Sequence, residues 1–207
     1  MRLKDKVYLY IEELISNGKL KSGDPIVETV FAERLHVSRT PVREALKDLE
    51  NDGFVISYPG KGTFVRQITT KDIENIYDVR SSLEVLALEK SFDSLDEYIL
   101  LNLKEKYINL EKNFSWEIAR KLDEDFHNYF INKANNETLS EILIKLNKQV
   151  SVYRTIASKD PNRSEKTINE HMKIIEAISR KDKDLAIEAL KIHLDSVKKS
   201  AIEASLM

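Results

Sequence analysis

The distribution of glycine separates this chain into two parts that can fold differently. All five glycines lie at or before Gly62, and the much longer remainder of the 207-residue chain contains none. That remainder therefore has no glycine-rich phosphate loop, and nothing in it suggests a βαβ unit or a nucleotide fold. Its apolar residues recur at helical spacing almost without interruption. The sequence predicts a mainly α-helical protein whose glycine-containing turns are confined to the N-terminal part.

Residues 38–53 form a predicted helix with two different faces. Ser38 is a suitable N-cap, Pro41 falls in the first turn, and Gly53 ends the helix. Opposite its apolar stripe, four polar side chains gather near the N-terminal end: Arg39, Thr40, Arg43 and Lys47. Arginine can bind guanine bidentately in a DNA major groove, and threonine can reach a phosphate or a thymine methyl. A solvated surface helix fits this pattern equally well, so the neighbouring elements must decide.

Two shorter helical patterns precede this helix. They span residues 3–17 and 27–35, and a tight turn at 36–38 separates the second pattern from the helix that follows. Three residues of the second pattern are expected to face inward: Val30, Phe31 and Leu35. A short helix, a three-residue turn and a second helix with a basic leading edge form a helix-turn-helix.

A predicted β-hairpin follows the helix-turn-helix. Residues 54–57 and 63–66 are β-prone, and the loop between them contains two glycines with Lys61 at its tip. Such a wing can lie along the minor groove or the DNA backbone, and Gly62 allows close approach. Taken alone, the hairpin would be an ordinary surface turn. Directly after a helix-turn-helix it indicates a winged DNA-binding domain.

Charge and composition are compatible with this interpretation. The net charge of −2 argues weakly against a generally basic nucleic-acid binder. However, residues 1–66 hold 11 Lys/Arg and 10 Asp/Glu, a net charge of +1, and residues 67–207 hold 22 and 25, a net charge of −3. The stretches 36–43 and 54–66 carry basic residues and no acidic ones. A local basic surface is sufficient for phosphate contact.

Several other classes of protein are disfavoured. The chain has no cysteine, which excludes a disulfide framework and a thiolate metal site. It contains no apolar run of the length needed for a transmembrane helix, and its N-terminus lacks the apolar core of a signal peptide. These features lead us to expect a cytoplasmic protein. The length fits one large or two small domains, and the apolar fraction of 42% is enough to form their cores.

The N-terminal part resembles the winged-helix domain of GntR-family transcription regulators. Four segments carry the resemblance: residues 18–20, 31–35, 37–46 and 60–65. The block Val-Ser-Arg-Thr-Pro-Val-Arg-Glu-Ala-Leu is the longest and most specific of them. The resemblance implies contacts to double-stranded DNA from six residues: Ser38, Arg39, Thr40, Arg43, Lys61 and Gly62. Many family members carry a basic residue at the start of the second helix, where this chain has Thr29.

The remainder is predicted to be an all-α bundle of six helices, or seven if boundaries shift. The six predicted helices span residues 71–92, 94–113, 115–134, 137–158, 163–180 and 182–205. The expected domain organisation is a winged helix-turn-helix at 1–66, a linker at 67–70 and a helical domain at 71–207.

Four ionisable residues in the helical part suggest a metal site. Asp123 and His127 lie one turn apart on an apolar face shared with Trp116, and His171 and His193 are each centred on the apolar stripe of another helix. For any single histidine, a hydrogen-bonded core residue is the simpler explanation, and Arg120 could likewise pair with Asp123. Burying all four groups unpaired would cost on the order of a few kcal/mol each. A shared divalent cation removes that cost, and three nitrogens with one oxygen suit Zn²⁺, Ni²⁺ or Mn²⁺.

The helical part also resembles the FCD effector-binding domain found in the FadR subfamily of GntR regulators. The resemblance is carried by residues 123–127, Asn136 with Leu139, residues 170–171 and residues 193–194. It implies that Asp123, His127, His171 and His193 bind a metal, most readily Zn²⁺, which helps hold a small carboxylate effector. Three further residues are candidates for contacting that effector: Arg80, Arg154 and Asn147. The alternative for Arg80 is a salt bridge to Glu84.

These observations favour a DNA-binding transcription regulator, more readily a repressor, that responds to a carboxylate metabolite. A homodimer would match a pseudo-palindromic operator. One alternative is a metal-dependent hydrolase, but the chain has no His-Glu-x-x-His motif. In addition, Glu124 and Asp125 are expected to point away from the ligand face, and Glu170 to turn aside from His171. Another alternative is a regulator whose metal is purely structural or is itself the signal. The sequence therefore predicts that the protein is not an enzyme.

Overall fold

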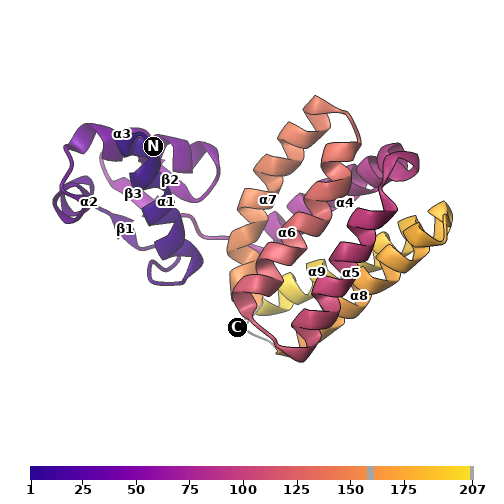
Figure 1. Cartoon of the computed structure of the whole chain (residues 1–207). Helices are drawn as coiled ribbons and strands as arrows, with labels where there is room; N and C mark the ends of the chain where they lie inside the picture. Colours follow the sequence, from indigo (N-terminus) through magenta and orange to yellow (C-terminus); the bar gives the residue numbers. More distant parts are fainter. Residues whose placement is uncertain (158–160, 206–207) are drawn as a thin grey trace. The chain divides into compact units, whose positions relative to one another are not determined.

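The computed structural model describes the backbone of residues 1–157 and 161–205, and the side chains of residues 1–150 and 163–205 (Figure 1). The chain divides into two compact units. One unit comprises residues 1–69 together with 147–156, and the other comprises residues 70–146 with the C-terminal residues from 157 onward. A small sheet lies in the first unit, and the second is helical. The mainly α-helical fold class predicted from the sequence is confirmed.

The N-terminal unit contains three helices and a three-stranded antiparallel sheet. Its elements in chain order are α1 (Leu3–Ser16), β1 (Pro25–Ile26), α2 (Glu28–Leu35), α3 (Arg39–Asn51), β2 (Val55–Tyr58) and β3 (Gly62–Val65). The strand order is β1-β3-β2, with Ile26 opposite Thr63 and Ile56 opposite Phe64. The sequence predicted the β2–β3 hairpin but no strand at residues 25–26. A strand of two residues is too short to produce an alternating pattern.

The core of this unit lies between α1, α3 and the sheet. It is formed by apolar residues that include Val7, Ile11, Leu46, Leu49 and Phe54. In α2, Phe31 and Ala32 are buried, but Val30 is 45% exposed, so the prediction that Val30 faces inward was wrong. Val30 and Ala32 lie about 200° apart around the helix, and therefore cannot both face the core.

The backbone turns sharply at both ends of α3. His36 adopts a left-handed conformation, with a φ of 54°, and ends α2. Ser38 then takes the extended N-cap conformation, although its side chain makes no capping hydrogen bond to the described residues. Gly53, with a φ of 83°, follows the last turn of α3, as the sequence predicted. These turns fix the direction in which α3 presents its N-terminal end.

The second unit contains six α-helices and a short 3₁₀ turn among its described residues, although residues 147–156 of α7 belong to the first unit. They are α4 (Thr70–Ser91), η1 (Phe92–Ser94), α5 (Glu97–Lys112), α6 (Trp116–Lys133), α7 (Glu137–Ala157), α8 (Pro161–Ser179) and α9 (Lys183–Ser205). These match the six predicted helices, and the predicted break after residue 92 is the η1 turn. None of the described helices combines the length and apolar character needed to cross a membrane.

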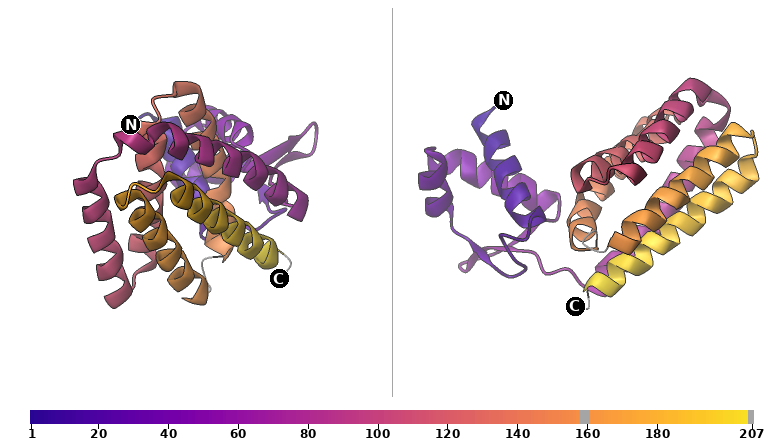
Figure 2. Two further views of the ribbon diagram at one scale, coloured as in Figure 1. Left: turned by 90° about the vertical axis from the view of Figure 1, so that its right-hand side faces the viewer. Right: turned by 60° about the horizontal axis from the view of Figure 1, so that its bottom comes forward.

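Five helices of this unit form a closed ring. Following the contacts around it, α4 packs on α6, α6 on α5, α5 on α8, α8 on α9, and α9 again on α4. The right view of Figure 2 shows α8 and α9 side by side. Apolar side chains from all five helices meet inside, among them Leu88, Leu103, Phe126, Ile174 and Leu190. Any polar group in this interior is therefore surrounded by apolar side chains and shielded from water.

The N-terminal core provides a test of these assignments. Leu49 is completely buried in α3, so Leu49→Ala should lower the free energy of unfolding by about 2–5 kcal/mol through lost packing and the resulting cavity. Leu9→Ala is the control, because Leu9 lies on α1 but is 50% exposed, and its effect should stay within about 0.5 kcal/mol. Denaturant unfolding followed by circular dichroism measures both changes. Equal losses in the two variants would contradict the placement of the core.

Candidate functional site

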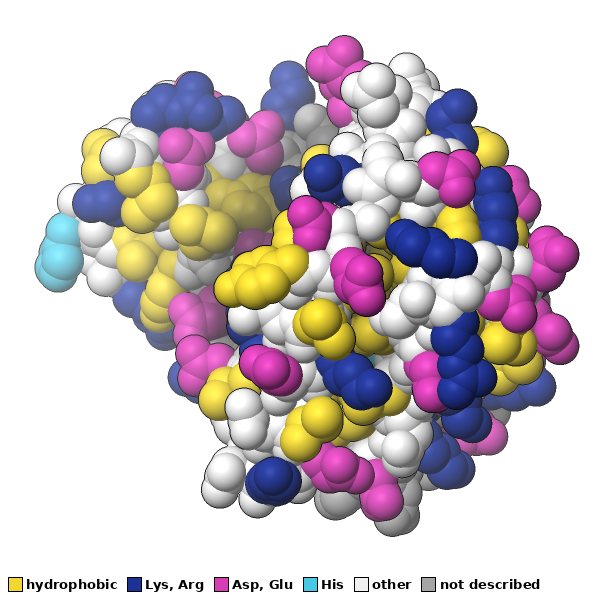
Figure 3. Space-filling model, turned by 45° about the vertical axis from the view of Figure 1, so that its right-hand side comes forward, with side chains coloured by type: hydrophobic (Ala, Val, Ile, Leu, Met, Phe, Trp, Pro, Cys, Tyr) yellow, Lys and Arg dark blue, Asp and Glu magenta, His cyan; other side chains and the backbone are white. Residues whose placement is uncertain are grey.

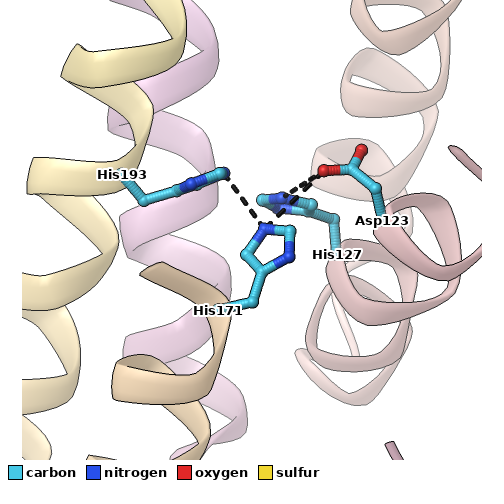
Figure 4. A group of neighbouring side chains, drawn as sticks. All are labelled: Asp123, His127, His171 and His193. Carbon is cyan, nitrogen blue, oxygen red and sulfur yellow. Dashed lines mark hydrogen bonds and ion pairs between the residues drawn. The ribbon is translucent and has the colours of Figure 1, made fainter. Parts of the chain in front are cut away.

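The four residues predicted to bind a metal lie together inside the helical ring (Figure 4). Asp123 and His127 come from α6, His171 from α8 and His193 from α9. One potential ligand atom from each residue lies within 4.8 Å of the other three. The Nε2 atoms of His171 and His193 are 3.2 Å apart, and the Asp123 Oδ1 atom is 3.6 Å from the Nε2 atom of His171 and 3.8 Å from that of His127.

Packing in the ring interior explains why these side chains converge. The i, i+4 spacing of Asp123 and His127 places both on the inner face of α6, as predicted. Phe126 packs against the His171 ring with a centroid distance of 4.5 Å, and the three histidines are almost completely buried. Trp116 was predicted to lie on the same apolar face, but its side chain is not buried. It is 43% exposed, because it begins α6 and packs edge-on against Phe114 at the end of the helix.

Each histidine is oriented by a hydrogen bond to its Nδ1 atom. The partner of His127 is Glu84 Oε2 of α4, at 2.5 Å, and the partner of His171 is the Tyr107 hydroxyl of α5, at 2.7 Å. The sequence-based interpretation missed both partners, since neither belongs to a recognisable motif. Their only signal is a polar group placed on an otherwise apolar helix face. With these bonds, all five ring helices contribute to one polar cluster.

Glu170 of α8 provides the third of these hydrogen bonds, and here the sequence-based expectation needs correction. Glu170 does turn aside from His171, but its Oε2 atom lies 2.8 Å from the Nδ1 atom of His193. This contact forms because α8 packs directly against α9. Neighbouring positions on α8 thus supply one predicted ligand, His171, and the residue that orients another.

An arginine holds each of the two carboxylates from its other side. Arg80 donates from Nε to Glu84 Oε1 at 2.5 Å, which is the salt bridge considered as the alternative role for Arg80. Arg163 donates from both terminal nitrogens to Glu170, at 3.2 and 3.0 Å. Because each arginine balances the charge of its carboxylate, Glu84 and Glu170 can be buried near the histidines at a lower electrostatic cost.

The hydrogen bonds also assign the protonation of the rings. Carboxylates accept from the Nδ1–H groups of His127 and His193, which leaves a lone pair on each Nε2 atom. Tyr107 donates its hydroxyl hydrogen to the Leu122 carbonyl oxygen at 3.3 Å, so its oxygen can accept from His171 Nδ1–H. With all three rings in this tautomer, three Nε2 lone pairs converge near Asp123. Burial lowers the pKa of His193 to about 4, which keeps its ring neutral near pH 7.

Converging lone pairs make this site suitable for a divalent transition metal. The buried Nε2 atom of His127 has no hydrogen-bond partner among the residues that the structure describes. A cation placed among the three Nε2 atoms and the carboxylate would satisfy all four groups. Three imidazoles and one carboxylate form a recognised donor set for such a metal, and carboxylates bound to the outer ring nitrogens accompany it in proteins.

The remaining charged residues of α6 lie outside the site. Glu124 pairs with Arg120 at 3.7 Å and Asp125 with Lys121 at 2.9 Å, both on the outer surface, as expected for side chains that point away from the ligand face. On the face drawn in Figure 3, basic and acidic side chains are interspersed over the helical unit. Its outer surface there carries mixed charge rather than a basic area suited to phosphate.

Two of the three predicted effector-binding residues can be assessed. Arg80 is fully buried, and its Nη1 and Nη2 atoms have no hydrogen-bond partner within the described part of the chain. The buried hydroxyl of Tyr77 likewise lacks one there, and the Arg80 guanidinium lies 5.5 Å from the Tyr77 ring centroid. Asn147 has a buried Oδ1 atom with no described partner. Arg154 lies outside the residues whose side chains are described.

The predicted DNA-contacting residues are all on the surface of the N-terminal unit. All seven are exposed. Five lie on or beside α3, namely Ser38, Arg39, Thr40, Arg43 and Lys47, and two lie in the wing, Lys61 and Gly62. Thr29 is exposed at the start of α2. One contact was not predicted: the Glu28 carboxylate, also in the first turn of α2, accepts hydrogen bonds from both Arg39 and Arg43.

Comparisons with known proteins agree with both halves of this description. Residues 3–65 match the gntR family of bacterial regulatory proteins, and residues 75–196 match the FCD domain. The "Uncharacterized HTH-type transcriptional regulator YdhC" of Bacillus subtilis (strain 168) is 32% identical over 193 residues, which cover 91% of this chain and 86% of the relative. The gluconate operon transcriptional repressor of Bacillus licheniformis is 27% identical over 88% of this chain and 78% of its own length.

A solved structure provides a comparison for the helical part. The Zn²⁺-bound FCD domain of the transcriptional regulator TM0439 is 29% identical, with a TM-score of 0.58 over 66% of this chain and 96% of its own. The family matches confirm the resemblance found in the sequence, and they favour a regulator over the alternative of a hydrolase. The chain therefore belongs to the GntR family of bacterial regulatory proteins, in which its helix-turn-helix and FCD domains make it a DNA-binding transcription regulator and not an enzyme.

Proposed function

We propose that this regulator binds its operator as a homodimer through α3 and the wing, and that a small carboxylate effector in the helical domain controls this binding. A divalent metal held by Asp123, His127, His171 and His193 takes part in holding the effector. The observation that carries the proposal is the convergence of three Nε2 atoms and one carboxylate, each ring being fixed by a further hydrogen bond. We further propose that the domains are divided as the sequence predicts, with the linker at residues 67–70.

Zn²⁺ is the metal that best suits the four residues, although Ni²⁺ and Mn²⁺ accept similar donors. Its assignment is supported by the three imidazole groups and by the Zn²⁺ named for the TM0439 domain. When bound, the metal supplies a Lewis-acidic position for an effector oxygen. Glu84, Tyr107 and Glu170 hold the three imidazoles in the orientation that coordination requires.

Arg80 is the residue best placed to bind an effector carboxylate. Leaving its buried terminal N–H groups without acceptors costs on the order of 1–3 kcal/mol each. A carboxylate would satisfy both nitrogens bidentately. Arg80 is also connected to the metal site, because Glu84 accepts a hydrogen bond from Arg80 on one oxygen and from His127 on the other. Arg154 and Asn147 are proposed as further contacts to the same effector.

The DNA-binding step rests on residues of the N-terminal unit. The exposed side chains of Arg39 and Arg43 would read base edges from the first turns of α3, while Thr40 and Lys61 contact the backbone. Two such units related by a two-fold axis would match a pseudo-palindromic operator. The effector alters operator affinity if effector and DNA prefer different arrangements of the dimer. We propose repression relieved by the effector, and the gluconate operon relative is likewise named a repressor.

A second candidate function has support from one observation. Four protein ligands complete a tetrahedral site, as in structural zinc centres, whereas a site open to a ligand has three. The metal would then stabilise the helical domain or would itself be the sensed signal. Metal removal and carboxylate addition, tested in separate experiments, distinguish a structural or sensed metal from a metal that holds the effector.

The metal proposal predicts a loss of stability on chelation. Zn²⁺ added to chelator-treated protein should bind with a stoichiometry of one per chain and raise the melting temperature, since the metal binds only the folded state. His127→Ala should abolish this stabilisation, while Glu124→Gln, an exposed change on the same helix, should keep it. Metal analysis combined with thermal unfolding checks both variants. Chelator-treated protein that retains full stability and still binds the effector would refute the role of the metal.

The effector proposal predicts a specific defect in Arg80→Lys. Lysine keeps the charge and a donor for Glu84 but loses the fork, so we expect at least a tenfold weaker response to whichever carboxylate stabilises the wild-type protein, with metal content unchanged. Thermal shifts with a panel of small carboxylates measure the response. Arg120→Lys, on the outer surface, is the matched control. If both variants respond like the wild type, Arg80 does not bind the effector. If Zn²⁺ alone changes the affinity for DNA, the metal itself is favoured as the signal.

The DNA-binding proposal is tested by removing the two arginines of α3. Each base-reading arginine is worth about 1–3 kcal/mol of discrimination, so Arg39→Ala/Arg43→Ala should weaken operator binding by at least about tenfold. Arg180→Ala/Lys199→Ala removes the same charge from exposed positions of the helical unit and should change the affinity much less. Fluorescence anisotropy at several salt concentrations provides the comparison. Unchanged operator affinity in the first variant would exclude these two residues as contacts.

A further inference from the structure

A single carboxylate connects the two arginines that α3 presents to solvent. Glu28 begins α2, and its Oε2 atom accepts from Arg39 Nη2 at 2.9 Å and from Arg43 Nη2 at 2.9 Å. Its Oε1 atom accepts from Arg43 Nε at 3.1 Å. The arginine side chains are 59% and 67% exposed, whereas that of Glu28 is only 25% exposed. Glu28 therefore lies behind the arginines and supports them from the protein side.

The geometry leaves both arginines able to bind another ligand. Arg43 uses its Nε and Nη2 atoms for Glu28, and its Nη1 atom and the second Nη2 hydrogen stay available. Arg39 uses one nitrogen only. Guanine presents two acceptors, O6 and N7, that such a free edge can contact. The carboxylate thus fixes one edge of the Arg43 fork without occupying the other.

Two physical effects follow from this contact. Arg39 and Arg43 lie one helical turn apart, where like charges repel, and a carboxylate between them offsets the repulsion and removes side-chain freedom before DNA arrives. The negative charge of Glu28 also weakens the attraction of this surface for phosphates of any sequence. Exposed ion pairs contribute little to folding stability. A contribution to stability therefore does not explain the three hydrogen bonds to Glu28.

Glu28 retains its charge under ordinary conditions. The hydrogen bond from Arg43 is the main cause that lowers the pKa of the Glu28 carboxyl below its usual value. The position at the N-terminus of α2 also favours an anion through the helix dipole.

We propose that Glu28 is a positioning residue for operator recognition, which aligns Arg39 and Arg43 for base contacts and restrains their sequence-independent attraction to the DNA backbone. The inference rests on the proposed role of these arginines in DNA binding. It assigns to an acidic side chain a part in specificity, which here means the ratio of affinities for operator and for unrelated DNA.

The test compares Glu28→Gln with Glu33→Gln. Both variants remove one negative charge from α2, but Glu33 is exposed and, among the described residues, makes no hydrogen bond or ion pair with either arginine. The probes are a duplex enriched by the wild-type protein from a random pool and a scrambled duplex of equal composition. For Glu28→Gln we expect the affinity ratio to fall about tenfold, comparable to one mismatched base pair. We also expect log affinity for scrambled DNA to fall more steeply with log salt, by about one unit of slope, because a released arginine gains a phosphate contact.

The control should change the ratio by less than about threefold, and Glu28→Asp, which keeps the charge, should give a ratio between those of the wild type and Glu28→Gln. Matching circular dichroism melting curves establish that each variant is folded. Equal ratios in Glu28→Gln and Glu33→Gln overturn the proposal, as does an increase in both affinities that leaves the ratio unchanged. If Arg39→Ala/Arg43→Ala loses no operator affinity, it is the proposed DNA contacts that fail. If that variant does lose affinity while Glu28→Gln matches Glu33→Gln, only the role of Glu28 fails.

Discussion

The helical domain depends on how its buried polar groups are satisfied. An imidazole placed in an apolar interior is costly unless each nitrogen has a partner, and three of them meet inside the ring of helices. Their outer nitrogens bind Glu84, Tyr107 and Glu170, and their inner nitrogens face one another and Asp123. Because these seven residues lie on α4, α5, α6, α8 and α9, a cation at the centre would couple the packing of all five helices. Metal occupancy and domain geometry would then be linked.

The sequence alone predicted which four residues meet inside the ring of helices, but not the residues that orient them. Asp123 and His127 follow from helical periodicity, and His171 and His193 stand out as polar residues on apolar stripes. Glu84 and Tyr107 could not be found in this way, because their roles depend on which helices become neighbours and in what rotation. Glu170 is the clearest example. Helical periodicity predicted that its side chain points away from His171, but it could not predict that the packing of α9 on α8 places His193 beside it.

The same limit applies to the N-terminal unit. Its helices and hairpin are local structures, and capping residues, glycines and alternating patterns were sufficient to place them. Strand β1 was missed because its pairing with β3 is a long-range contact between two very short segments. Val30 was misplaced because a helix of two turns tolerates more than one choice of buried face. Glu28 was missed for a related reason: its contact with Arg43 crosses from one helix to the next.

Arginine–carboxylate pairs occur in both units. Whether the arginine or the carboxylate is the residue held in place differs between the buried pairs and the exposed ones. Inside the ring, Arg80 and Arg163 neutralise carboxylates that in turn orient histidines, and the low dielectric makes each of these bonds strong. On α2 and α3 the roles are reversed. There the carboxylate of Glu28, which is partly shielded from solvent, holds two arginines that remain exposed. There, water and salt weaken the pair, so DNA can compete for the arginines. A buried pair can therefore fix a site permanently, while an exposed pair can orient residues that must still bind a further partner.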